Sequence, residues 1–194
     1  MQRRSTTNSS RAPRSSGSDD AVSMLMEDHK KVQKLFRDFD KAHDKQDDET
    51  CQQIVELVCA ELEVHTTLEE ELFYPAAREV LGEDEELIDE AEIEHRSAKD
   101  LIAELRVMDA ADQKFAPTFT VLAEYVKHHI KEEEGEIFPK VKKAKLDVDS
   151  LGEEMQTRKT QLIQEGRLGE GRPENDGKDE AEQPRSRTRA RAAS

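Results

Sequence analysis

The chain is poor in several residue types that other protein classes depend on. Its 194 residues include no tryptophan, two tyrosines and two cysteines, and aromatic residues make up 4% of it. No apolar run approaches the ~18 residues that a membrane-spanning helix needs. No alternating run of Val, Ile or Thr bounded by turn residues indicates a β-strand. We therefore expect an all-α protein without a membrane span.

The scarcity of cysteine also limits redox chemistry. Cys51 and Cys59 are eight residues apart, which is about 12 Å along a helix, whereas a disulfide needs Cα atoms within about 7 Å. There is no Cys-x-x-Cys pair and no flavin or haem motif, so a second redox centre is not indicated. Two reduced thiols favour a reducing, cytoplasmic compartment.

The two ends of the chain lack any apolar pattern. Residues 1–20 and 165–194 are rich in Ser, Arg, Pro, Gly and charged residues, and we expect both to be disordered tails. The first segment has no apolar stretch typical of a secretory signal. A transit peptide is the less favoured alternative, because Asp19 and Asp20 follow closely. The arginines at 185, 187, 189 and 191 suggest a solubilising tail more than an RNA or anionic-surface contact.

The charge balance bears on the partners of the remaining segment. Charged residues make up 39% of the chain and hydrophobic residues 34%, against averages of roughly 25% and 45–50%. The net charge is −15. The tails do not supply it: the first has an excess of arginine, and the last has equal numbers of acidic and basic residues. The middle of the chain is therefore strongly acidic, which argues against nucleic acid as its partner. A protein partner would attach through the tails.

Four segments between the tails carry apolar residues every three or four positions, as amphipathic helices do. Their stripes are Val22, Met26, His29, Val32, Phe36 and Phe39; Cys51, Val55, Val58, Leu62, His65, Glu69 and Leu72; Ile88, Ala91, His95, Ala98, Ile102 and Leu105; and Phe119, Leu122, Val126, His129, Glu133 and Ile137. Pro75 and Pro139 are predicted to kink or break their helices. Short linkers predict an up-down-up-down antiparallel four-helix bundle over residues 21–145, and a short extra helix within 146–164 follows it.

The bundle sequence also repeats itself. HTTLEEELFYP and HIKEEEGEIFP lie 64 residues apart, each with His first, Glu at four and Pro at ten. DHKKVQKLF and EHRSAKDLI lie 66 residues apart, each with an acid before His and a basic residue after it. The repeat predicts two helical hairpins of similar design.

Six ionisable residues fall within the apolar stripes: His29, His65, Glu69, His95, His129 and Glu133. Each His-x-x-x-Glu pair lies on one helix face, one turn apart. Burying unpaired carboxylates costs several kcal/mol each, which metal ions would compensate. Nitrogen and carboxylate ligands without thiolate favour iron or manganese, and six ligands exceed one tetrahedral zinc ion. We expect two non-haem iron ions, with manganese or zinc less favoured.

These motifs resemble the hemerythrin-like family, the HHE cation-binding domains. The resemblance covers about residues 20–145, and LGEEMQTRK is similar to the helix that often follows such domains. It implies a di-iron site with the four histidines as terminal ligands and the two glutamates as bridges. Oxygen-carrying members have a second histidine on the third helix and an aspartate on the fourth. Here Ala91 and Lys99 flank His95 at four residues, which puts reversible oxygen carriage in doubt. One iron would then have an open position, or take Glu92 or a water.

Three functions fit this sequence. The favoured one is a protein that binds or senses dioxygen, nitric oxide or peroxide, or handles iron. The alternative is a di-iron redox enzyme, for catalase-like peroxide breakdown or for nitric oxide or iron redox chemistry, with no catalytic residue assigned. The minor alternative is a metal-free helical interaction module.

Some neighbouring residues carry weaker predictions. His128 is more easily explained as a surface residue than as a ligand, and His43 is expected to be solvated. Tyr74 and Tyr125 are both expected in the core, and Tyr125 could also donate a hydrogen bond to a bound ligand. The acidic runs are expected to form solvated faces, with a supplementary ligand or an iron entry path as the alternative; they comprise Glu70, Glu71, Glu132, Glu134 and Glu136.

Overall fold

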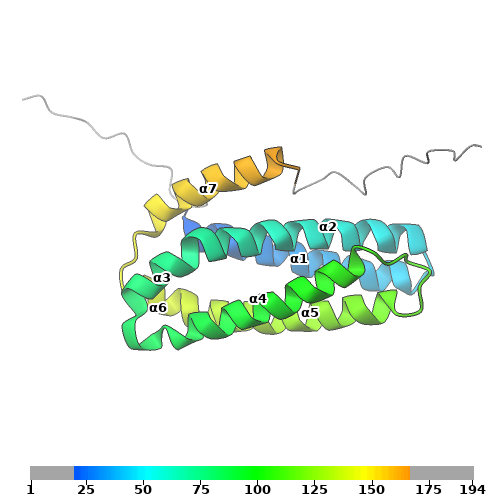
Figure 1. The fold of residues 1–194 in the computed structure, drawn as a ribbon, viewed down its shortest axis with the longest axis horizontal. Coiled ribbons are helices and arrows are strands. Elements are labelled where there is room, and N and C mark those ends of the chain that lie inside the picture. The colour runs from blue at the N-terminus through cyan, green and yellow to red at the C-terminus, as the bar shows by residue number, and fades with distance from the viewer. Residues whose placement is uncertain (1–19, 167–194) are drawn as a thin grey trace, which may run out of the picture.

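Four long helices pack side by side in the computed structural model, which describes residues 20–166 (Figure 1). They are α1 (Ala21–His43), α2 (Asp48–Leu68), α4 (Glu86–Leu105) and α5 (Phe115–Glu132). The part of the chain that is described contains no strand. The predicted all-α bundle is confirmed. The predicted tails, including the arginine run near the C-terminus, lie almost wholly outside the described residues.

Aspartate side chains cap the N-termini of three of the helices. Asp20 accepts a hydrogen bond from the Ser23 backbone N–H (3.0 Å), and Asp47 accepts one from that of Thr50 (3.1 Å). Asp147 does the same at the start of α7 (Val148–Gln164). Such caps satisfy backbone donors that have no partner within the helix.

A π-helical turn precedes each of the two prolines, Pro75 and Pro139. The π-helix η1 (Glu69–Phe73) leads from α2 into α3 (Tyr74–Leu81), and η3 (Glu133–Ile137) leads from α5 into α6 (Phe138–Lys143). Proline has no N–H, and its ring would clash with the carbonyl four residues earlier. The wider turn just before each proline keeps the chain helical. The expected interruptions are thus π turns, which occur frequently at functional sites.

The apolar core forms two clusters. One cluster includes Phe36, Phe39 and Phe119, and the other includes Phe73 and Phe138. Cys51 and Cys59 are buried on α2 and form no disulfide, as predicted. Burial raises the pKa of the Cys59 thiol to about 12, which keeps it protonated and unreactive.

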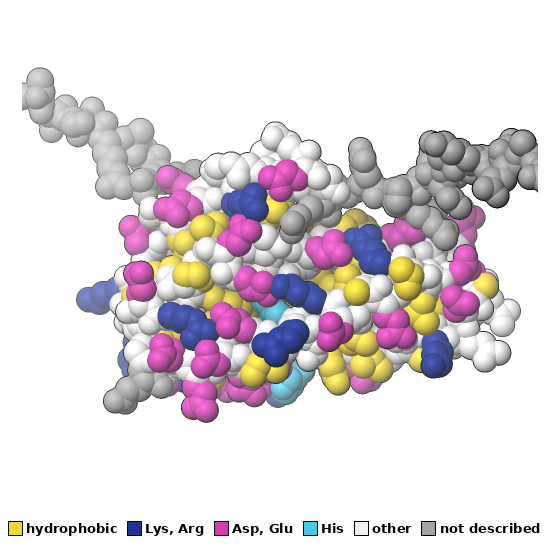
Figure 2. All heavy atoms as spheres, viewed as in Figure 1, with side chains coloured by type: hydrophobic (Ala, Val, Ile, Leu, Met, Phe, Trp, Pro, Cys, Tyr) yellow, Lys and Arg dark blue, Asp and Glu magenta, His cyan; other side chains and the backbone are white. Residues whose placement is uncertain are grey.

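The last described helix, α7, lies against α1, α2 and η1 (Figure 1). It follows α6 after a short connection. The 3₁₀ turn η2 (Gly82–Asp84) lies earlier in the chain, between α3 and α4. The apolar side of α7 buries Leu151, Met155 and Leu162 in the cluster that contains Phe138. Among the described residues, no helix combines the length and the apolar character needed to cross a membrane. Figure 2 shows acidic side chains spread over the visible face, with basic ones between them.

Candidate metal centre

The bundle brings all six predicted ligands together in its interior. Each long helix supplies one histidine, and the first residue of each π turn supplies a glutamate. All six residues are at most 7% exposed. They are His29 on α1, His65 on α2, Glu69 on η1, His95 on α4, His129 on α5 and Glu133 on η3.

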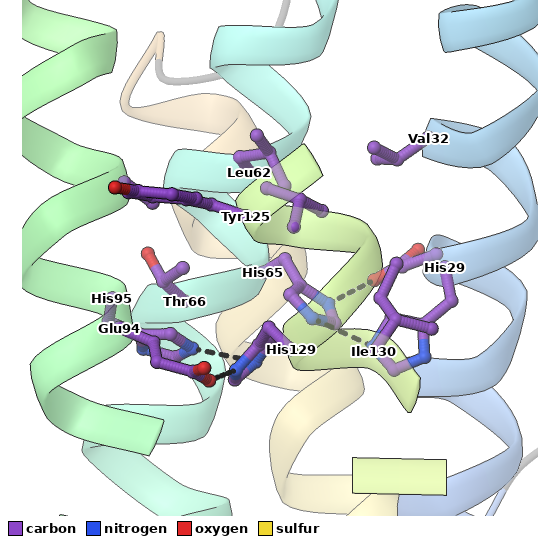
Figure 3. Close-up of a pocket in the computed structure, with 13 residues that line it drawn as sticks. His29, Val32, Leu62, His65, Thr66, Glu94, His95, Tyr125, His129 and Ile130 are labelled. Carbon is purple, nitrogen blue, oxygen red and sulfur yellow. Dashed lines mark hydrogen bonds and ion pairs between the residues drawn. The ribbon is translucent and has the colours of Figure 1, made fainter. Parts of the chain in front are cut away.

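The four imidazoles form two pairs that meet through their Nε2 atoms. The Nε2 atoms of His29 and His65 are 3.2 Å apart, and those of His95 and His129 are 3.1 Å apart. In Figure 3 the rings of each pair point toward one another beneath the apolar side chains Val32 and Leu62. Each pair thus presents two nitrogens to one small region.

Each buried carboxylate lies between the two pairs. Glu69 Oε2 is 3.3 Å from the Nε2 atoms of both His65 and His95. Glu133 Oε2 is 3.2 Å from His29 Nε2 and 3.4 Å from His129 Nε2. Each glutamate therefore contacts one imidazole of each pair.

A second set of carboxylates contacts the outer side of the rings. Three imidazoles place Nδ1 within hydrogen-bond distance of a carboxylate, and the fourth has a carboxylate slightly farther away. The pairs are His29 with Glu134 (2.9 Å), His95 with Glu70 (3.0 Å), His129 with Glu94 (2.8 Å) and His65 with Asp28 (3.7 Å). An ionised carboxylate only accepts, so Nδ1 carries the proton. A neutral imidazole then has its lone pair on Nε2, where a metal binds.

These outer carboxylates differ from the sequence prediction. Glu70 and Glu134 were expected on solvated faces, but both are half-buried and bonded to imidazoles. Lys99 holds Glu70 from outside, with its Nζ 2.6 Å from both oxygens. The hydrogen bond with His95, and then the contacts with Lys99, keep the pKa of Glu70 low, at about 2, against the effect of burial. The sequence did contain a signal for these two residues, because the repeat places an acidic residue directly after each buried glutamate.

The site stabilises positive charge on its histidines. Burial alone would lower the pKa of His129, but the carboxylates of Glu133 and Glu94 outweigh it and raise the pKa well above its usual value. The pKa values of His29 and His95 are raised for similar reasons. Burial would raise the pKa of Glu133, but the neighbouring histidines lower it strongly.

Several buried polar atoms lack hydrogen-bond partners. Both carboxylate oxygens of Glu69, Oε2 of Glu133 and Nδ1 of His65 have none. Such atoms are costly unless a cation or water pairs with them. Groups formed by His29, His65, Glu69 and Glu133, and by Glu69, His95 and His129, place their donor atoms within 4.8 Å of one another. Each of these two groups, which share Glu69, could therefore hold a metal ion.

Tyr74 is a polar member of the site that the sequence did not identify. Its hydroxyl donates to Glu133 Oε1 (3.0 Å) and lies 3.2 Å from His95 Nε2. Burial, together with Glu69 and Glu133, raises the pKa of Tyr74 well above 10, so the phenol retains its proton. Phe138 occupies the equivalent position in the repeat and stacks on His29. The equivalence places both aromatic rings beside the histidines.

Other residues considered from the sequence lie outside the cluster. Glu92 pairs with Arg78 at 3.1 Å and does not join the imidazoles. His128 is 61% exposed, and His43 is an exposed residue at the end of α1. The expectation that Tyr125 lies in the core is wrong, because its side chain is 51% exposed and lies at the wall of a cavity beside the histidines.

A small cavity adjoins the four histidines (Figure 3). Its volume is about 30 Å³. Apart from the site residues, its walls are mostly apolar and include Val32, Leu62, Ala98, Val126 and Ile130. This volume exceeds the roughly 10–15 Å³ that one water molecule occupies on the same measure. The cavity therefore has room for a molecule of two heavy atoms.

Comparisons with known proteins identify relatives of this chain. The family described as hemerythrin HHE cation binding domain matches residues 20–141. An uncharacterized hemerythrin-like protein of Schizosaccharomyces pombe is 28% identical over 66% of this chain and 62% of its own length. A DNA nickase of Nostoc sp. is 28% identical over 59% of this chain and 31% of its own length. The chain thus spans less than two thirds of either relative.

A solved structure has the same fold. The crystal structure of a hemerythrin HHE cation binding domain-containing protein from Mycobacterium kansasii aligns with a TM-score of 0.64. The alignment covers 75% of this chain and 88% of that one, at 23% identity. At this identity the likeness concerns the fold.

Proposed function

Because the chain belongs to the hemerythrin HHE cation-binding domain family, we propose that it holds two iron ions in the bundle and uses them to bind or sense a small ligand such as dioxygen or nitric oxide. His29, His65, His95 and His129 are the terminal ligands, and Glu69 and Glu133 bridge the ions. The mixed imidazole and carboxylate donors suit iron or manganese better than a closed zinc site, and of these two metals we propose iron. The free thiols of Cys51 and Cys59 fit a reducing, cytoplasmic compartment.

The observation that carries this proposal is the meeting of imidazole Nε2 atoms. His95 and His129 both donate Nδ1–H to carboxylates, so in their neutral forms two Nε2 lone pairs face each other at 3.1 Å. Such a contact is repulsive unless one of the two nitrogens carries a proton or a metal ion binds beside both. The unpartnered oxygens of Glu69 and Glu133 lie next to these pairs. A metal ion satisfies both groups of atoms.

The apolar cavity supports a small uncharged ligand. Bound ferrous ions supply the electrons and open positions that dioxygen or nitric oxide requires. The chain contributes selectivity, because Val32, Leu62 and Ile130 exclude water and charged molecules from the imidazoles. The Nδ1 carboxylates fix the ring orientation before a ligand arrives.

Tyr74 favours one second candidate, the breakdown of hydrogen peroxide. Its hydroxyl oxygen, which is protonated, lies 3.2 Å from His95 Nε2 and 3.0 Å from Glu133 Oε1. Its proton is donated to Glu133, so the hydroxyl oxygen can accept a hydrogen bond from a peroxide and orient it. Two peroxide molecules balance as two waters and one dioxygen, so no outside reductant is needed.

Metal analysis tests the binding proposal. After anaerobic ferrous loading and removal of loose iron, we expect two irons per chain. His65→Ala and Glu133→Ala should lose at least one of them, whereas His43→Ala, at an exposed residue, should retain both. A wild-type chain that retains no metal would refute the proposal.

Ligand exposure then separates the two functions. A reversible spectral change of the diferrous protein with dioxygen or nitric oxide supports ligand binding. Dioxygen evolution from peroxide that is lost in Glu133→Ala supports peroxide breakdown. Full peroxide activity in Glu133→Ala excludes the site as its source.

A further inference from the structure

The two halves of the bundle differ on their outer faces. Equivalent positions lie 66 residues apart between α1 and α4, and 64 apart between α2 and α5. The half formed by α1 and α2 presents apolar residues next to the metal centre: Met24, Val64, Leu68 and Leu72. The equivalent residues of the half formed by α4 and α5 are Glu90, His128, Glu132 and Glu136. A nearly symmetric core is thus flanked by two chemically different surfaces.

Helix α7 fills the apolar face. Leu151, Met155 and Leu162 pack into the cluster that contains those residues. Between α7 and α1, the Lys159 ammonium contacts both oxygens of Asp28, at 2.6 and 2.7 Å. Asp28 in turn faces His65 Nδ1. On this side, therefore, a cation from the chain itself neutralises the outer carboxylate.

The acidic face contains a small cavity instead. Its volume is about 40 Å³, and no lysine or arginine lines it. Its walls include Glu90, Glu94, Glu132 and Glu136, and it reaches His129 and Glu133. Four glutamates and no basic side chain give the walls of this cavity a negative charge. Oε2 of Glu133, which is fully buried, has no hydrogen-bond partner.

The exposed His128 forms a set of metal donors with two residues that line this cavity, Glu94 and Glu132. Its Nε2 is 3.1 Å from Glu132 Oε1 and 3.7 Å from Glu94 Oε1. One donor atom of each residue lies within 4.8 Å of the others. The other oxygen of Glu94 accepts from His129 Nδ1 at 2.8 Å. Glu94 therefore connects an exposed donor set to a histidine of the buried centre.

We propose that His128, Glu132 and Glu94 form an entry site for a divalent transition-metal ion, ferrous iron in the cell, on the way to the buried centre. The ion takes the place beside Glu94 that the Lys159 ammonium takes beside the equivalent Asp28. One imidazole and two carboxylates suit such an ion. The glutamates around the cavity raise the local concentration of the ion. Glu133 lines the cavity and places Oε2 3.4 Å from His129 Nε2, so it can accept the ion inside. This role rests on the proposed di-metal function.

Loading kinetics test the entry role. Metal-free full-length chain is mixed with limiting Co²⁺, and filling of the buried centre is followed by the visible absorption of the bound ion. His128→Ala and Glu132→Gln should slow filling by about tenfold, the low end of electrostatic focusing, with unchanged final occupancy. His43→Ala is the matched control and should fill at the wild-type rate.

A second measurement detects the ion at the entry site itself. Protein whose buried centre is already filled with Zn²⁺ receives Mn²⁺, and the imidazole resonances are recorded. Mn²⁺ should broaden the His128 resonance in wild type and leave it sharp in Glu132→Gln, while His43 stays sharp in both.

The outcomes separate the two proposals. Equal filling rates in all variants, or a His128 resonance that Mn²⁺ leaves sharp, would overturn the entry role while the buried centre stands. A wild-type chain whose buried centre never fills overturns the proposed function, and the entry role with it.

Discussion

At the scale of single residues, each imidazole is held from two sides by carboxylates with different tasks. The inner glutamates face Nε2 and lie where metal ions would bind. The outer acids face Nδ1 and fix the ring and its proton. His95 illustrates this division, with Glu69 at 3.3 Å on one side and Glu70 at 3.0 Å on the other. Two consecutive residues of η1 thus serve one histidine in opposite ways.

This division predicts unequal effects for two glutamates. Glu70→Ala removes the acceptor of His95 Nδ1–H, and metal affinity should fall by about 10–100-fold. Glu92→Ala removes the same charge from a residue that pairs with Arg78, and affinity should stay near wild type. Competition with a chelator measures both constants. An equal loss in both variants would mean that net charge, not ring orientation, controls affinity.

The sequence predicted the inner residues but not the outer ones, for a physical reason. Helical periodicity shows which side chains enter the core, and Glu69 and Glu133 stand in register with apolar neighbours. The residue after each falls off that stripe and therefore looks solvated. Only the contact between helices brings Glu70 to His95 and Glu134 to His29. Tyr74 was predicted to be buried, yet burial alone does not say where its hydroxyl points.

At the scale of elements, α7 is held by two neighbouring cations in different settings. Lys159 contacts Asp28, which is 8% exposed, whereas Arg158 contacts Glu71 on the surface. Burial would raise the pKa of Asp28, but His65 and Lys159 lower it, so the carboxylate is ionised. The amphipathic pattern of α7 predicted a packed helix. It did not indicate the face, because the partner of Lys159 lies 131 residues away.

The two cations should therefore differ in their effect on stability. Lys159→Met leaves a buried charge unpaired and should lower the free energy of unfolding by about 3 kcal/mol. Arg158→Met breaks an exposed pair and should cost at most about 1 kcal/mol. Urea unfolding of the metal-free chain measures both. Adding Asp28→Asn to Lys159→Met should restore part of the loss. Equal losses in the two single variants would contradict the buried role of Lys159.

At the scale of the whole molecule, the internal repeat accounts for most of the architecture. Two hairpins of the same design place their histidines and glutamates at one depth, so the sequence predicted both the bundle and the meeting of the six residues. The repeat does not specify how α7 covers one half and leaves the other open. That asymmetry places the acidic cavity on the α4 and α5 side.

The charge of the interior links pH, metal and stability. In the metal-free chain the pKa values of His29, His95 and His129 are raised above 6.5 by the buried carboxylates. Groups with raised folded-state pKa values stabilise the fold fully below the unfolded value, and this contribution is lost as pH rises through the folded values. The lowered pKa of Glu133 also stabilises the fold, but this contribution is complete above about pH 4.5 and is lost only in acid.

Metal-free protein should thus melt at lower temperature as pH rises from about 6 to 8. Bound metal replaces the lost protons, and its affinity rises over the same interval because fewer protons compete for the imidazoles. The difference in Tm between loaded and metal-free chain should widen with pH. Calorimetry of both forms at several pH values measures it, with His129→Gln, which lacks one raised group, showing a shallower dependence. A constant difference would mean that protons and metal do not compete for these nitrogens, and the buried centre would then lie elsewhere.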